Sequence, residues 1–118
     1  MSSPAARARA RLREDTIARL RAVLADRPPA GGAERVILFG SMARGDFDGA
    51  SDADLLVVGG DGVLDSGIWA AVGDRDCDVV PWTREAWARA LAQGHPFATT
   101  IAREGVELWR APWALPLR

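Results

Sequence analysis

Several residue types are absent or nearly absent from this sequence, and each absence removes a class of chemistry. The 118 residues contain no lysine and no tyrosine, and they contain one cysteine, Cys77, and one histidine, His95. Without lysine, neither a phosphate-binding loop of the Walker type nor a lysine nucleophile is possible. One cysteine excludes an internal disulfide, and one cysteine with one histidine supplies too few ligands for a structural zinc site.

Long hydrophobic runs are also missing. No segment reaches the roughly 18 consecutive apolar residues of a membrane span, and no signal-peptide core is present. The composition is that of a globular protein, with 48% hydrophobic residues and a formal net charge of −1. We therefore expect a cytoplasmic location, no membrane partner and no direct nucleic-acid binding driven by overall charge.

The length of 118 residues predicts one domain with a real core. We expect an N-terminal helix and linker over residues 1–33, a core over residues 34–110 and a tail over residues 111–118. A chain of this size is too short for a catalytic domain plus a separate substrate domain. The first segment is rich in arginine, which predicts either a solvated helix face or a surface for RNA or an acidic partner.

The first chemical motif lies at the end of a predicted strand. Residues 36–39 form a short apolar run that ends at a glycine, which is typical of a buried strand. Gly40 lets the backbone turn sharply, and Ser41 can open a short helix through Arg44. Such a turn presents free backbone N–H groups, which can bind an anion.

The second motif begins ten residues after this turn, at the start of another predicted strand. Asp52 and Asp54 share one face of that strand, with Cα atoms about 7 Å apart, because side chains alternate along a strand. Two carboxylates so placed can hold divalent metal ions, and paired metals about 4 Å apart promote phosphoryl transfer. Asp46 and Asp48, in contrast, are predicted to belong to an ordinary turn that ends at Gly49.

Helices and strands alternate along the rest of the chain. We expect helices from residue 4 to before Pro28, within residues 61–73, over 83–92 and over 96–103, and strands over 76–80 and 106–109. Pro81 is expected to end the first of these strands. The alternation predicts an α/β or α+β domain with a small mixed sheet, helices packed on one side and the carboxylates on the open side.

The two motifs together resemble those of the DNA-polymerase-β-like nucleotidyltransferases. Residues 39–41 (Phe-Gly-Ser), a ten-residue gap and residues 52–55 (Asp-Ala-Asp-Leu) follow the signature of that superfamily. Residues 40–45 and 51–57 are closer still to the minimal nucleotidyltransferases, whose best-known members are antitoxins paired with HEPN toxins. Either motif alone is common in turns, whereas both together, each beside its own strand, form a specific signal. The resemblance covers residues 36–109 and implies the nucleotidyltransferase fold.

The resemblance implies a three-carboxylate metal centre. Asp52 and Asp54 would bind two Mg²⁺ ions. Asp78, which precedes two apolar residues, matches the family's third carboxylate, which binds a metal and helps to take the proton from the attacking hydroxyl. Asp76 shares a strand face with Asp78 and is expected to be a solvated strand-end charge.

The resemblance also implies a binding site for ATP. Gly40 and Ser41 would hold the β- and γ-phosphates through backbone amides and the serine hydroxyl. Arg44 would either add positive charge beside the phosphates or serve as a structural residue of the short helix. His95 lies between a glycine and a proline and is expected to be a connecting residue rather than a base.

Known antitoxins of this kind transfer AMP from ATP to a tyrosine of the HEPN ribonuclease and silence it. The resemblance therefore implies metal-dependent AMP transfer to a partner, and the absence of tyrosine excludes tyrosine modification within this chain. Two alternatives stay open. The chain could be a non-catalytic antitoxin that masks its toxin by binding, or a small-molecule nucleotidyltransferase whose substrate pocket forms only in an oligomer.

Overall fold

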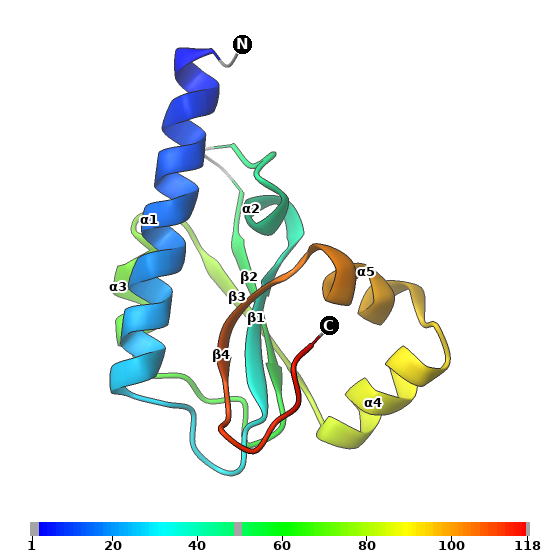
Figure 1. Ribbon diagram of the computed structural model, residues 1–118. Coiled ribbons are helices and arrows are strands. Elements are labelled where there is room, and N and C mark those ends of the chain that lie inside the picture. The colour runs from blue at the N-terminus through cyan, green and yellow to red at the C-terminus, as the bar shows by residue number, and fades with distance from the viewer. Residues whose placement is uncertain (1–2, 49–50, 118) are drawn as a thin grey trace.

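The structure is a computed structural model, and it describes residues 3–48 and 51–117 (Figure 1). Its elements in chain order are α1 (Pro4–Asp26), β1 (Arg35–Phe39), α2 (Gly40–Arg44), β2 (Ala53–Val58), α3 (Gly67–Val72), β3 (Cys77–Trp82), α4 (Arg84–Ala92), α5 (Pro96–Glu104) and β4 (Val106–Arg110). The predicted turn at residues 46–49 includes Gly49, which lies outside the described residues.

The four strands form one mixed sheet in the order β3-β2-β1-β4. β1 pairs antiparallel with β2 and with β4, whereas β2 pairs parallel with β3. The register places Phe39 beside Asp54 and Asp54 beside Asp78. The predicted mixed sheet is therefore confirmed, and its pairing brings residues from three strands to one end of the sheet.

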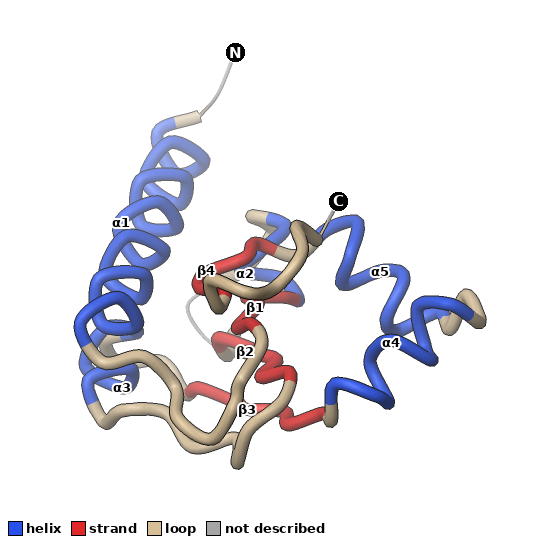
Figure 2. The backbone as a smooth tube through the Cα atoms, turned by 60° about the horizontal axis from the view of Figure 1, so that its bottom comes forward, coloured by secondary structure: helices blue, strands red, loops and turns tan. Residues whose placement is uncertain are grey.

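Helices cover both faces of the sheet (Figure 2). α1 and α3 pack on the face that carries Val36 and Leu55. α4 and α5 pack on the opposite face, against Ile37, Leu56 and Val58. The expectation that helices pack on one side holds for α1 and α3, but α4 and α5 pack against the face that was expected to be open. α4 and α5 bury this face because Trp87 and Ile101 pack against its apolar side chains. The sequence pattern had not indicated that these two residues contact the sheet.

β3 continues through Pro81 to Trp82, so the expectation that this proline ends the strand is wrong. The physical reason is the position of β3 at the edge of the sheet. A proline cannot donate a backbone hydrogen bond, and an edge strand leaves half of its donors without a neighbouring strand. The extra residues extend the parallel pairing with β2 to Val58.

Three arginines of α1 hold other elements in place. Arg13 donates to the carbonyl oxygens of Met42 and Ala43, with its shortest contact 2.7 Å long. Arg19 donates to the Ala71 carbonyl at 3.0 Å, and Arg21 donates to the Glu107 carbonyl at 3.0 Å. Part of the basic character of α1 therefore serves the fold. Within the described residues, no helix is long and apolar enough to cross a membrane.

Candidate active site

The predicted carboxylates lie at one end of the sheet, on the face that packs on α4 and α5. Asp54 alternates with Leu56 along β2, and Leu56 belongs to the apolar cluster of that face. Asp78 is its register partner on β3, so their Cα atoms are about 4.8 Å apart, as in any pair of adjacent strands. Asp52 immediately precedes β2, two residues from Asp54. Asp52 and Asp54 are half-buried, and Asp78 is exposed.

The environment of Asp54 opposes its negative charge. Burial raises the pKa of Asp54, and the charges of Asp78 and then Asp52 raise this pKa further. Arg44 lowers this pKa, but its effect is the smallest of the four. Asp52 and Asp78 are thus both close enough to repel the Asp54 carboxylate, and Asp76 is not among the causes of the shift. The structure brings Asp78, rather than Asp76, beside Asp54.

The nearest arginines do not neutralise these carboxylates. Arg44 donates to Asp46 at 3.1 Å and lies 4.0 Å from Glu104. Arg75 donates to the backbone carbonyl of Ser51 at 2.6 Å. Both guanidinium groups are therefore engaged elsewhere, so the negative charge at the end of the sheet is left largely uncompensated by the described residues.

Gly40 lies directly against the Asp54 carboxylate. Its φ of +77° belongs to the region that favours glycine. A Cβ atom at this position would lie 2.5 Å from Asp54 Oδ2, which is closer than real Cβ atoms approach. The glycine of the first motif therefore has two functions. It turns the chain from β1 into α2, and it leaves space for the carboxylate of the second motif.

The short helix α2 begins at Gly40, one residue before the position expected from Ser41. Phe39 precedes it and provides no side-chain hydrogen bond to the first backbone N–H groups. Gly45 ends the helix in the left-handed conformation, with φ +91°. The first turn of α2 thus has no side-chain cap, and it lies at the same end of the sheet as the carboxylates.

Comparison with known proteins assigns this arrangement to a family. Residues 17–90, more than half of the chain, match the nucleotidyltransferase domain family. The chain belongs to this family. The match begins within α1, ends within α4 and includes both motifs and all three carboxylates.

No curated protein matches this nucleotidyltransferase domain. A solved structure of a toxin-antitoxin with AMP-PNP aligns with a TM-score of 0.48 and 22% sequence identity, over 81% of this chain and 74% of that chain.

The donor set fits a divalent cation. Mg²⁺ prefers carboxylate oxygens, and a cation would relieve the repulsion that raises the pKa of Asp54. Among the described residues, however, no three acidic, histidine or cysteine side chains already surround a common point. The side chains of Asp52, Asp54 and Asp78 would therefore have to adjust their rotamers to share a metal ion.

Cys77 and His95 do not add to the chemistry of this nucleotidyltransferase domain. Burial, followed by the charges of Asp78, Asp54 and Asp52, raises the pKa of the Cys77 thiol to about 11, so the thiol is protonated at neutral pH. His95 precedes α5, where its Nδ1 atom accepts a hydrogen bond from the Phe97 N–H at 3.2 Å. His95 is therefore a helix cap, a role that its position before a proline could have suggested.

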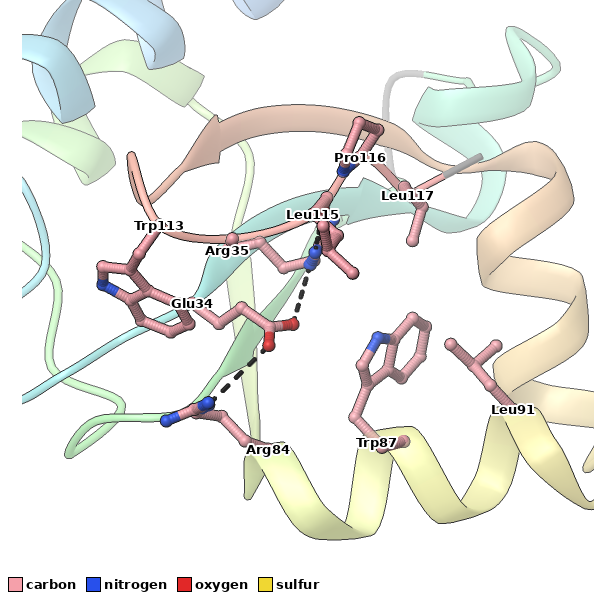
Figure 3. A pocket seen from close by; sticks show the side chains of 11 residues that line it. Glu34, Arg35, Arg84, Trp87, Leu91, Trp113, Leu115, Pro116 and Leu117 are labelled. Atoms are coloured by element: carbon pink, nitrogen blue, oxygen red, sulfur yellow. Dashed lines mark hydrogen bonds and ion pairs between the residues drawn. The ribbon is translucent and has the colours of Figure 1, made fainter.

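A cavity of about 380 Å³ lies at the opposite end of β1 from Gly40 (Figure 3). Trp87 and Trp113 line it together with charged residues. Its one carboxylate, Glu34, already accepts from Arg35 at 2.9 Å and lies 3.7 Å from Arg84. The described lining of this cavity therefore offers no group of unpaired carboxylates that could hold a metal ion. Although this cavity is larger than the one beside Gly40, we do not assign the metal-dependent chemistry to it.

A smaller cavity, of about 190 Å³, adjoins the first motif and was not foreseen. Phe39, Gly40 and Arg44 contribute one side of it, and residues of α5 contribute the other. In the sequence, Phe97 was the one residue that could have indicated this cavity. A single phenylalanine near the start of a helix, however, does not show which other residues its ring contacts.

Proposed function

We propose that this chain is a metal-dependent nucleotidyltransferase that moves AMP from ATP to a hydroxyl of a partner protein. The sequence resemblance favours a tyrosine of a HEPN toxin as acceptor, which would make the chain an antitoxin that acts by AMPylation. The observation that carries the proposal is the uncompensated group of Asp52, Asp54 and Asp78 beside the uncapped turn at Gly40. Carboxylates in such a group destabilise a fold unless they bind cations.

In the proposed mechanism, Gly40 and Ser41 hold the β- and γ-phosphates through backbone N–H groups and the serine hydroxyl. Asp52, Asp54 and Asp78 hold Mg²⁺, which when bound supplies charge stabilisation at the phosphoryl oxygens. Asp78 is exposed and can accept the proton of the attacking hydroxyl. The hydroxyl oxygen forms a bond to the α-phosphorus, the bond from this phosphorus to the bridging oxygen breaks, and pyrophosphate leaves.

Arg44 is proposed to act at the side of the triphosphate. Its guanidinium group is exposed and is engaged with Asp46, whose hydrogen bond is the main reason that the pKa of Arg44 is raised. Asp54 also contributes to this shift, which places Arg44 within electrostatic reach of the carboxylates. A surface ion pair such as Arg44–Asp46 is weak, so the side chain can turn towards a bound phosphate at small cost.

A partner is proposed as the source of the acceptor because no tyrosine occurs in the 118 residues. Positioning the acceptor hydroxyl about 3 to 3.5 Å from the α-phosphorus, in line with the departing pyrophosphate, can account for several kcal/mol of the barrier. The partner must therefore dock at the carboxylate end of the sheet, where Asp78 is exposed.

Calorimetry with ATP tests the metal-dependent site. We expect binding in the presence of Mg²⁺ and little binding in EDTA, because the triphosphate and the carboxylates repel each other without a cation. Asp54→Asn is expected to weaken the Mg²⁺-dependent part, and Asp76→Asn serves as a matched control on the segment leading into β3. Equal affinity for ATP with Mg²⁺ and in EDTA would contradict the proposed metal bridge.

A further inference from the structure

The cavity of about 190 Å³ lies between α2 and α5, beside the proposed phosphate site. Its lining consists of Phe39, Gly40 and Arg44 on one side and Phe97, Thr100, Ile101 and Glu104 of α5 on the other. It is smaller than the 300–1,000 Å³ of pockets for drug-sized ligands, so it suits one planar group rather than a whole nucleotide. Gly40 belongs both to this cavity and to the turn proposed for the phosphates, and the two sites are therefore continuous.

An exposed aromatic ring forms one wall of the cavity. Phe97 is 37% exposed, although it lies at the start of a helix that buries Ala98 and Ile101. Its ring contacts Phe39 edge-on, with centroids 5.6 Å apart, and contacts Trp82 with centroids 5.5 Å apart. The ring is thus held from two sides while part of it stays accessible.

The backbone around Phe97 is also fixed. Pro96 occupies the first turn of α5, and the His95 side chain accepts a hydrogen bond from the Phe97 N–H. A ring that is already ordered loses little conformational entropy when a ligand stacks on it. The first turn of α5 therefore supports a pre-organised stacking surface.

Polar side chains stand on the same cavity. Glu104 is half-buried, and its carboxylate lies 4.0 Å from Arg44 and 3.6 Å from Arg103. Neither distance is a short hydrogen bond, so its oxygens can still accept one from a ligand. Thr100 offers a hydroxyl, which both donates and accepts. A flat apolar wall with acceptors and a donor nearby has the chemistry that recognises a nucleobase, because a base combines a π-face with polar edges.

We propose that this cavity holds the base of the donor nucleotide, with the base stacked on Phe97 and its edge towards Thr100 and Glu104. The inference rests on the proposed function, since the cavity gains this meaning from the phosphate site at Gly40. It adds a recognition element that neither sequence motif contains. The other occupant of suitable chemistry, an aromatic side chain of the acceptor protein, is an outcome of the test below.

The test compares the affinity for ATP with the affinity for inorganic tripolyphosphate, which has the phosphates but no base. Both are titrated by calorimetry in Mg²⁺ against the unmodified protein, Phe97→Leu and Phe97→Ala. Leucine keeps apolar volume in the aromatic cluster, so it reports on stacking even where alanine lowers stability. Trp69→Ala is the control, because Trp69 is an exposed aromatic residue of α3, on the opposite face of the sheet.

We expect Phe97→Leu and Phe97→Ala to weaken ATP binding by roughly 5- to 150-fold, the range set by base–aromatic stacking, and to leave tripolyphosphate binding unchanged. Trp69→Ala should alter neither affinity. An unchanged ratio of the two affinities in both Phe97 variants would overturn the inference. If ATP binding is unchanged but transfer to the partner falls, the cavity belongs to the acceptor and the inference is also overturned.

The same titrations separate this inference from the proposed function. A protein that binds no tripolyphosphate in Mg²⁺ lacks the proposed phosphate site. In that outcome, ATP binding that still depends on Phe97 supports the cavity as a base site, whereas ATP binding that does not depend on Phe97 contradicts it.

Discussion

Asp54 occupies a position in which its own charge is unfavourable. Burial comes first among the causes that raise its pKa, followed by the charges of Asp78 and Asp52. A residue that served only to stabilise the fold would be better replaced by a neutral side chain of the same shape. The unfavourable charge of Asp54 is explained if the carboxylate binds a cation during function.

Asp54→Asn should increase the stability of the metal-free protein at pH 7. Because the pKa of Asp54 is raised in the folded state, the unfolded state ionises more readily at this position. The stability linked to this group is therefore fully present below the unfolded value of about 3.9 and is lost as the pH rises through the folded value. Asparagine carries no charge at either pH, whereas aspartate is charged at pH 7 and mostly protonated near pH 3. The gain in the free energy of unfolding should therefore be present at pH 7 and absent near pH 3.

Chemical denaturation at both pH values, in EDTA, measures this gain. Transfer activity measured in parallel should fall by at least about 100-fold, the lower range for groups that act directly in catalysis. A loss of stability at pH 7 would show instead that Asp54 is a structural residue.

Gly40→Ala should damage the site more than the fold. Alanine at a positive φ costs about 1–2 kcal/mol wherever it is introduced, and at this position its Cβ would also lie 2.5 Å from Asp54 Oδ2. Gly94→Ala is the matched control, because Gly94 has φ +67° and a Cβ atom there would meet no atom of the described residues within 4 Å, its own chain neighbours aside.

Both variants should lose similar stability in thermal unfolding, but Gly40→Ala alone should lose ATP binding in Mg²⁺. Equal ATP affinity in the two variants would show that the contact between Gly40 and Asp54 has no role in the site.

Among the secondary-structure elements, α1 has a structural role that its arginine content did not reveal. Arg13 binds the carbonyl oxygens of Met42 and Ala43 in α2, and Arg19 binds the Ala71 carbonyl in α3. Carbonyl groups at the end of a helix have no partner within that helix, and a cation there also opposes the partial negative charge of the helix end. α1 thus fixes α2, the element that begins at Gly40.

Arg13→Ala should lower the free energy of unfolding by about 1.5–3 kcal/mol, the range for hydrogen bonds that involve a charged group. Alanine has the highest helix propensity, so the loss would not come from α1 itself. Arg11→Ala is the control, since Arg11 is exposed on the same helix, and it should change stability by less than about 0.5 kcal/mol. Urea denaturation of both variants would decide this. Equal effects would show that the Arg13 contacts contribute nothing.

The local elements of the fold could be predicted from sequence, whereas contacts between distant residues could not. Apolar runs beside glycine marked β1 and β2, and Thr83 was correctly expected to cap α4, where its Oγ1 atom accepts from the Ala86 N–H. These signals lie within a few residues of their effect. The strand through Pro81 depends instead on β3 being at an edge, which is a property of the assembled sheet.

The candidate site likewise combines residues that local sequence motifs predict with contacts between distant residues that they do not predict. The carboxylates and the glycine turn follow from two short motifs, and strand alternation placed Asp52 and Asp54 on one face. The contact of Phe97 with Phe39 joins residues 58 positions apart, and it depends on how α5 returns to the sheet. No local pattern contains that information, and the second helical layer was missed for the same reason.

In the whole molecule, the helices that stabilise one face of the sheet lie on the opposite side from the proposed active site. α1 and α3 cover one face and belong to the larger apolar cluster. The carboxylates, the Gly40 turn and the Phe97 cavity lie at one end of the other face, beside α5. A partner that approaches this end can reach the carboxylates without disturbing α1, which is consistent with an acceptor supplied by another protein.

Mass spectrometry of the intact partner after incubation with this chain, ATP and Mg²⁺ tests the central claim most directly. The partner to use is the proposed one, a HEPN protein, where a neighbouring gene encodes it. We predict the addition of one or more AMP groups to a tyrosine of that protein, no addition in EDTA and none with Asp54→Asn. A complex that binds tightly and silences the toxin, but adds no mass to it, would contradict the account and favour an antitoxin that acts by masking.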